Sequence, residues 1–142
     1  MPSETGPDWP AFYLMRLIMQ EHGARWQDGL PGLTRPQYAV LRVIAARPDA
    51  EQTAIGEATA TDQATLAALL HRLEKRGLVA RTVDPADRRR RRVRLTRSGR
   101  RALREAAEHA TALNAGILAR LTPGEQARLH ELLTKLAAKE GG

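Results

Sequence analysis

The sequence has no cysteine among its 142 residues. Disulfide bonds, thiolate metal sites and cysteine-based redox sensing are therefore excluded. Its apolar runs all fall far short of the roughly 20 residues that cross a bilayer. The first thirty residues also lack the basic and apolar regions that make up a signal peptide. We expect a cytoplasmic protein without membrane contact.

Residues that commonly carry catalysis or bind metal ions are scarce as well. The serines are Ser3 and Ser98, and neither has a neighbouring histidine that could serve as its base. The histidines fall on four separate predicted helices, without the short spacing of metal ligands: His22, His71, His109 and His130. We therefore expect no catalytic residue, no metal site and no cofactor.

Positive charge is present in excess, and it is concentrated. The whole chain carries +7, with a pI near 10.9. Residues 72–104 hold 14 Lys and Arg against 3 Asp and Glu, a net +11, which leaves −4 for the rest. Charge that serves only solubility is spread more evenly, so this segment indicates a defined surface for a polyanion.

Within that segment, residues 78–96 predict a β-hairpin with a charged tip. Two β-prone runs, 78–83 and 92–95, flank a turn in which Asp84-Pro85 precedes five consecutive arginines at 88–92. Guanidinium groups at the tip of a hairpin suit the narrow, electronegative minor groove of DNA. A solvated basic loop is the alternative interpretation.

Hydrophobic patterns predict long helices at both ends of the chain. A helix from Trp9 to about Asp28 is apolar on almost every side, which in so small a chain suggests contact with a partner subunit. Thr96 caps a long helix to about residue 121, in which Asn114 needs a hydrogen-bond partner if it is buried. A capping box at Thr122 starts the last helix, whose apolar face is leucine: Leu129, Leu132, Leu133 and Leu136.

Residues 34–76 predict three further helices. A capping box at Thr34 opens the first, and the same capping logic at Asp49 starts a short helix to about residue 58. Thr61 or Asp62 caps the third helix, which Gly77 ends.

The third of these helices combines a clean apolar stripe with a face suited to DNA. The stripe has helical spacing: Leu66, Leu69, Leu70 and Leu73. The candidate DNA contacts are small or polar residues at the start of the helix and basic residues near its end: Gln63, Ala64, Thr65, Ala68, His71, Arg72 and Lys75. Gln63 and His71 can reach base edges in a major groove, whereas the two basic residues would meet phosphates. A basic last turn is common in helices, but a helix-turn-helix before a basic hairpin is the more specific pattern of a winged helix-turn-helix.

Five motifs together resemble the MarR family of bacterial transcription regulators, over about residues 9–138. They are Leu33-Thr34-x-x-Gln37, Asp62-x-x-Thr65, Arg72-Leu73-Glu74-x-x-Gly77-Leu78-Val79-x-Arg81, Asp84-Pro85-x-Asp87-Arg88-Arg89 and Leu95-Thr96-x-x-Gly99. The resemblance implies a mainly α fold with a small β-hairpin wing and a single domain over residues 1–142. A winged helix-turn-helix lobe would occupy 34–96, and dimerisation helices would occupy 9–33 and 97–140.

The same resemblance implies roles for individual residues. Residues 62–76 would form the recognition helix, Arg89 would enter the minor groove, and Asp87 would brace the wing by ion pairing. The remaining candidate DNA contacts of the hairpin are Arg81, Arg88, Arg90 and Arg91. The sequence also departs from the family around the turn before the recognition helix. Thr59 and Thr61 stand where apolar residues are usual, and Gly56 stands where alanine is usual.

A second resemblance concerns the first helix. Arg16, His22 and Trp26 have a spacing similar to that of family members that sense protocatechuate and related aromatic acids. The three positions lie within about 120° of the helical wheel and can face one cavity, which Tyr38 could also line. A guanidinium binds a carboxylate, an imidazole meets a phenol, and an indole covers a ring. Alternatively, the arginine and histidine make intersubunit hydrogen bonds and the tryptophan packs in the core.

The sequence thus predicts a homodimeric repressor of a pseudo-palindromic operator in double-stranded DNA, released by a small aromatic carboxylate. The alternative is an architectural or nonspecific nucleic-acid-binding protein without a ligand. Preference for one DNA sequence separates the two.

Overall fold

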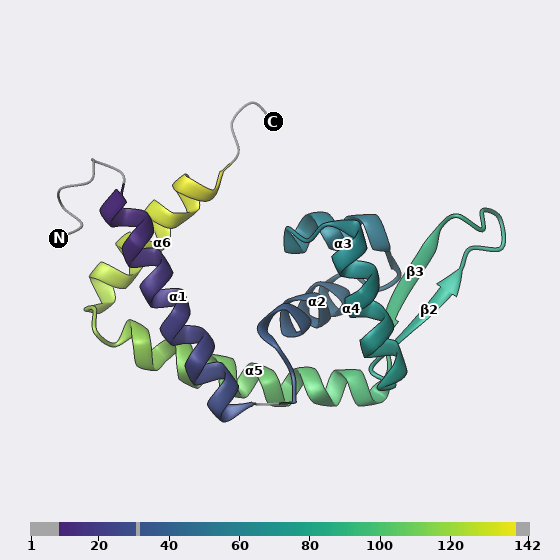
Figure 1. Cartoon of the computed structure of the whole chain (residues 1–142), viewed down its shortest axis with the longest axis horizontal. Coiled ribbons are helices and arrows are strands. Elements are labelled where there is room, and N and C mark those ends of the chain that lie inside the picture. The colour runs from purple at the N-terminus through teal and green to yellow at the C-terminus, as the bar shows by residue number, and fades with distance from the viewer. Residues whose placement is uncertain (1–8, 31, 139–142) are drawn as a thin grey trace.

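A computed structural model describes residues 9–30 and 32–138, which form six helices and one small antiparallel sheet (Figure 1). In chain order the elements are α1 (Trp9–Gly29), α2 (Arg35–Ala46), β1 (Ala50–Glu51), α3 (Gln52–Thr59), α4 (Gln63–Lys75), β2 (Val79–Val83), β3 (Arg91–Leu95), α5 (Arg97–Leu118) and α6 (Pro123–Ala137). The predicted mainly α fold with a β-hairpin wing is confirmed.

The helix α5 connects two parts of the molecule (Figure 1). At one end, α2, α3, α4 and the sheet form a lobe, from which the β2–β3 hairpin projects. At the other end, α1 and α6 form an arm that rises from α5 on the side away from the hairpin. None of the described helices is long and apolar enough to cross a membrane.

The main core lies in the lobe and extends along α5. Its largest fully buried side chains come from α2, α3, α4 and strand β3: Val40, Leu41, Ile44, Ile55, Leu66, Leu70, Leu73 and Val93. The apolar stripe of α4 therefore faces inward as predicted, with Leu69 partly buried beside it. Burying this stripe leaves the opposite face of α4 on the surface.

Side-chain caps set the starts of several helices. Thr34 and Thr122 form the predicted capping boxes with Gln37 and Glu125, and Thr96 caps α5. Of the two candidate caps for α4, Asp62 takes the role. At the other end of α4, Gly77 adopts φ 75°, a conformation that suits a residue without a Cβ atom.

The predicted cap at Asp49 is wrong. Asp49 has φ 61° and is followed by the two-residue strand β1, so α3 begins only at Gln52. The carboxylate of Asp49 instead accepts hydrogen bonds from Arg94 at 2.8 and 2.9 Å, and this guanidinium holds the pKa of Asp49 below its ordinary value. Strand β1 pairs with β3, giving the order β1-β3-β2. Two residues are too short to show a period-2 pattern in the sequence.

Candidate DNA-binding surface and effector site

The seven candidate DNA contacts on α4 are all exposed. At the start of the helix, Asp62 Oδ1 accepts the backbone N–H of Thr65 at 2.9 Å, and Thr65 Oγ1 donates to Asp62 Oδ2 at 2.8 Å. These hydrogen bonds lower the pKa of Asp62 and keep its carboxylate charged. The hydroxyl of Thr65 is therefore engaged by the cap, whereas Gln63 and His71 remain at the surface of the helix.

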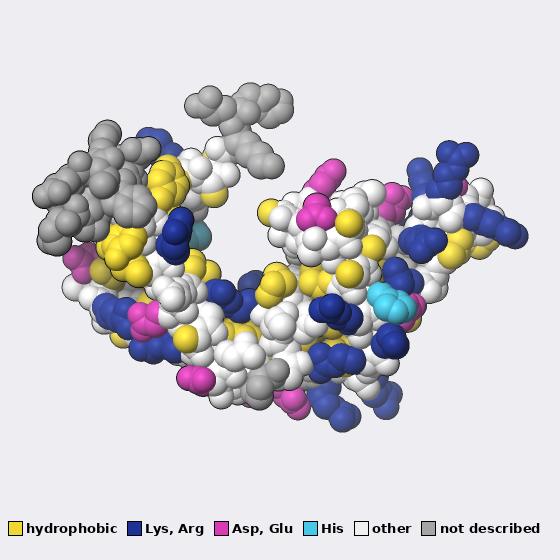
Figure 2. Space-filling model, viewed as in Figure 1, with side chains coloured by type: hydrophobic (Ala, Val, Ile, Leu, Met, Phe, Trp, Pro, Cys, Tyr) yellow, Lys and Arg dark blue, Asp and Glu magenta, His cyan; other side chains and the backbone are white. Residues whose placement is uncertain are grey.

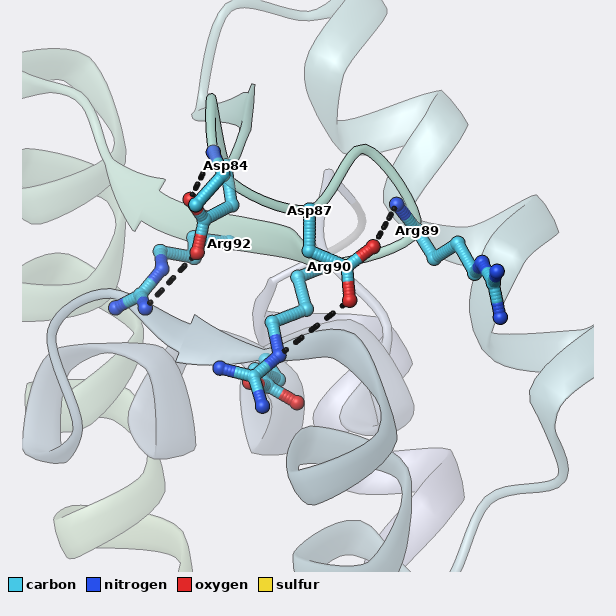
Figure 3. A network of polar contacts seen from close by, with 7 residues as sticks. Asp84, Asp87, Arg89, Arg90 and Arg92 are labelled. Atoms are coloured by element: carbon cyan, nitrogen blue, oxygen red, sulfur yellow. Dashed lines mark hydrogen bonds and ion pairs between the residues drawn. The ribbon is translucent and has the colours of Figure 1, made fainter.

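The tip of the wing is held by its own aspartates (Figure 3). Asp84 Oδ1 accepts the backbone N–H of Ala86 at 2.9 Å, and Asp87 Oδ1 accepts the backbone N–H of Arg89 at 3.0 Å. The ion pair of Asp87 with Arg90 spans 4.0 Å, the outer limit for such a contact. Asp87 thus braces the wing through the backbone of Arg89 as well as through an ion pair of the kind that the resemblance implied.

The five consecutive arginines divide into two groups. Arg92 lies 3.5 Å from Asp84, and Arg90 lies 3.5 Å from Glu51. Neither Arg88, Arg89 nor Arg91 forms an ion pair with a carboxylate of the described residues, and all three are exposed. The side chain of Arg89 extends away from the loop in Figure 3, and Lys and Arg side chains gather at the hairpin tip in Figure 2. Like charges this close repel one another, so a polyanion would relieve their repulsion.

Arg81 has a partner inside the lobe. Its guanidinium donates to Glu74 Oε1 at 2.8 and 3.3 Å, and 18% of its side chain is exposed. The hydrogen bonds from Arg81 lower the pKa of Glu74. This pair joins β2 to the last turn of α4, so Arg81 is less available to a phosphate than the unpaired arginines of the tip.

At the base of the arm, His22 connects three helices. Its Nε2 lies 2.8 Å from Asn114 Oδ1 on α5, and its Nδ1 lies 3.3 Å from Arg35 Nη1 on α2. Because Arg35 can only donate, Nδ1 accepts and Nε2–H donates, which fits a neutral imidazole. Asn114 is exposed, so the predicted need for a partner if buried does not arise, but it accepts this hydrogen bond nonetheless. Arg35 also donates to the carbonyl oxygen of Met19 at 3.1 Å.

Two other residues proposed for an effector site pack beside His22. Trp26 is 2% exposed and donates to the carbonyl oxygen of Leu33 at 2.5 Å. Its ring centroid lies 6.4 Å from that of His22 and 5.0 Å from that of Tyr38. Trp26 is therefore a core residue. Its indole packs against the rings of His22 and Tyr38, and the three form an aromatic cluster.

Arg16 forms no hydrogen bond with that cluster. It is exposed and makes no hydrogen bond or ion pair with the described residues. The structure thus brings together His22, Trp26 and Tyr38 but leaves the guanidinium free.

Sequence reasoning missed His109. Its ring lies 5.4 Å from that of Trp26, and its Nε2 is buried without a hydrogen-bond partner among the described residues. No spacing in the sequence marked it, because the tryptophan that its ring contacts lies on α1, far away along the chain.

The arm exposes a large apolar surface. On α1 the exposed residues are Phe12, Leu14, Leu17, Ile18 and Met19, with Phe12 at 62%, and on α6 they are Leu132, Leu133 and Leu136. No residue of α6 is buried. Figure 2 shows hydrophobic side chains gathered on this arm. Such a surface is typical of a protein interface.

A buried stripe on α4, an exposed opposite face and a projecting basic hairpin define a winged helix-turn-helix DNA-binding protein. A family model described as the MarR family matches residues 32–90. The transcriptional regulator HosA from Escherichia coli O111:H- is 47% identical over 126 residues, which cover 89% of this chain and 93% of HosA. The chain belongs to the MarR family and is a DNA-binding transcriptional regulator.

Two solved structures resemble the whole fold. PcaV from Streptomyces coelicolor, in complex with its natural ligand, is 35% identical with a TM-score of 0.85, covering 94% of this chain and 93% of PcaV. BpsR from Bordetella bronchiseptica, whose DNA binding is regulated by 6-hydroxynicotinic acid, is 32% identical with a TM-score of 0.87. That similarity covers 95% of this chain and 100% of BpsR.

Proposed function

We propose that the protein is a homodimeric repressor that binds a pseudo-palindromic operator and leaves it when a small aromatic carboxylate binds. One observation carries the DNA-binding part. The exposed face of α4 and three unpaired arginines of the wing belong to the same lobe. Side chains of α4 would read a major groove, and the wing would reach the adjacent minor groove.

The apolar arm supports the homodimer. Exposed leucines, Phe12 and Ile18 on α1 and α6 would be covered by the same surface of a second copy, as two-fold symmetry requires. The whole chain would then act as one domain, with α1, α5 and α6 in the interface and residues 34–96 on DNA. Two recognition helices about 34 Å apart would meet successive major grooves. Such a repressor would act in the cytoplasm, where the chromosome lies.

The effector part rests on the cluster around His22. A carboxylate bound by Arg16 would place its ring toward His22, Trp26 and Tyr38, where the surrounding rings favour an aromatic body. His22 hydrogen-bonds to both the lobe, through Arg35, and α5, through Asn114. A ligand that takes over these hydrogen bonds would change how the lobe is held. The similar regulators PcaV, with its natural ligand, and BpsR, with 6-hydroxynicotinic acid, support a small-molecule effector.

The operator test separates this proposal from an architectural role. We expect the protein to select a pseudo-palindrome from random duplexes and to bind it roughly 10³-fold more tightly than random DNA at physiological salt. Sedimentation should show a dimer both free and on DNA. Near-equal affinity for all duplexes would favour the architectural alternative, whose binding depends on phosphates alone.

Replacing Arg16 with alanine should abolish the effector response while operator affinity stays within about twofold, since the side chain is exposed and unpaired. Benzoates, hydroxybenzoates, cinnamates and nicotinates are first screened by thermal shift, in which stabilisation grows with ligand concentration. The hit is then tested for operator release. In the wild type the ligand should weaken DNA binding by a coupling of about 1–3 kcal/mol. Arg25→Ala, on the same helix, is the matched control, and a normal response of Arg16→Ala would place the site elsewhere.

A further inference from the structure

The side-chain amide of Gln63 lies against the one residue of α3 that has no side chain. Gly56 is buried, and a Cβ atom built on it would lie 2.4 Å from Gln63 Nε2. The same Cβ atom would lie 3.0 Å from the carbonyl oxygen of Thr61 and 3.4 Å from Leu66 Cδ2. The amide therefore occupies the space that a methyl group would fill at this position.

This placement brings the side chain of Gln63 close to the wing as well as to α3. The residue lines a polar crevice of about 240 Å³ formed by the start of α3, the start of α4 and the wing: Glu51, Gln52, Thr53, Gln63, Arg89, Arg90 and Arg91. Gln63 is the first residue of α4 after its cap, and it is exposed. Its amide thus lies on the side of the recognition helix that faces the wing arginines.

We propose that Gly56 is a positioning residue for DNA recognition, and that its bare backbone determines which base pair of each half-site Gln63 prefers. The inference rests on the proposed role of α4 in sequence reading. A glutamine amide can pair in two hydrogen bonds with adenine, but only from a restricted range of positions. With glycine at position 56, the Gln63 amide lies close against α3 when it meets the bases. With any residue that has a Cβ atom, the amide moves away from α3 and approaches the bases from another direction.

Gly56→Ala tests this directly, because the nearest atom is the far end of a flexible side chain, and the Thr61 carbonyl oxygen at 3.0 Å needs to shift by only a few tenths of an ångström. Alanine is also the better helix former, which offsets that shift, so the variant should keep its dimer and a thermal midpoint close to that of the wild type. Gly124→Ala is the matched control, since its added Cβ atom meets nothing within 4 Å. Base preference is measured for full-length dimers by selection from a randomised operator library and by affinities for single-base operator variants.

We expect one symmetric position of the operator to change its preferred base in Gly56→Ala and none to change in Gly124→Ala. In the wild type, a wrong base pair at that position should cost about tenfold in affinity, and Gln63→Ala should remove this penalty. In the Gln63→Ala background, Gly56→Ala should cause no further change. An effect of Gly56→Ala that persists without the glutamine would overturn the proposal, as would an unaltered preference in Gly56→Ala.

A measurement on the wild type keeps the test independent of how the variant folds. Nuclear Overhauser contacts between the Gln63 amide protons and the Gly56 α-protons are expected in the free dimer, and their absence overturns the proposal. A wild type without any sequence preference would remove the proposed function together with this inference. A wild type that selects an operator in the same way as Gln63→Ala would remove this inference alone.

Discussion

Arg89→Ala is expected to weaken operator binding by about 2 kcal/mol, or roughly 30-fold, while leaving the dimer and its helix content unchanged. Arg89 is exposed at the wing tip, and its guanidinium forms no ion pair with the described residues. Its loss therefore breaks no side-chain ion pair or hydrogen bond among the described residues, and the effect falls on DNA. Fluorescence anisotropy on the selected operator measures the affinity, and circular dichroism measures the helix content.

Two comparisons make the Arg89 result specific. Arg128→Ala removes an exposed arginine from α6, in the arm, and should leave operator affinity nearly unchanged. The salt dependence gives a second readout, since losing a phosphate contact lowers the slope of log affinity against log salt by about 1. If Arg89→Ala binds the operator as the wild type does, the wing tip has no part in recognition.

Gly99→Ala is expected to lower the free energy of unfolding by about 3 kcal/mol, the upper end for adding a methyl group to a packed site. A Cβ atom on Gly99 would lie 1.9 Å from the carbonyl oxygen of Leu78. That atom is backbone and cannot rotate away. The same carbonyl accepts the N–H of Thr96 at 3.1 Å, while Thr96 Oγ1 accepts the N–H of Gly99 at 3.0 Å. To relieve the clash, either the first turn of α5 or the backbone at Leu78, just before β2, would have to move. Such a movement would break the hydrogen bonds that cap α5 or join it to Leu78.

Urea denaturation followed by far-ultraviolet circular dichroism measures the loss of stability in Gly99→Ala. Gly124→Ala, in the first turn of α6 with open space around it, should stay within about 0.5 kcal/mol of the wild type. A loss below about 1 kcal/mol in Gly99→Ala would show that α5 can shift relative to Leu78, contrary to the close packing of this structure.

The Leu-Thr-x-x-Gly motif illustrates what a sequence pattern can and cannot tell. Thr96 was predictable as a cap, because a cap hydrogen bond joins residues three apart. The requirement for Gly99 was not derivable from spacing, because the atom that excludes a side chain belongs to Leu78, which reaches it through the fold. The motif thus combines one local and one tertiary cause.

The features of the candidate DNA-binding and effector sites also divide into those with a local cause and those with a tertiary cause. The exposed face of α4 followed from its leucine stripe, because helical spacing fixes which side chains share a face. Which wing arginines are free did not follow, since Glu51 and Asp84 select Arg90 and Arg92 through the pairing of strands. His109 was missed because its neighbour Trp26 is far away along the chain.

By itself, the sequence determined the helices, the threonine caps of α2, α5 and α6, the charged hairpin and the segment that carries the positive charge. These features depend on residues within about four positions of one another, where the chain has few conformations to choose from. Only the tertiary structure decided the partners of Asp49, Arg81 and His22, the place of strand β1 and the contact of Gln63 with Gly56. Each of these joins separate elements, and burial of the shared leucine core sets their relative positions.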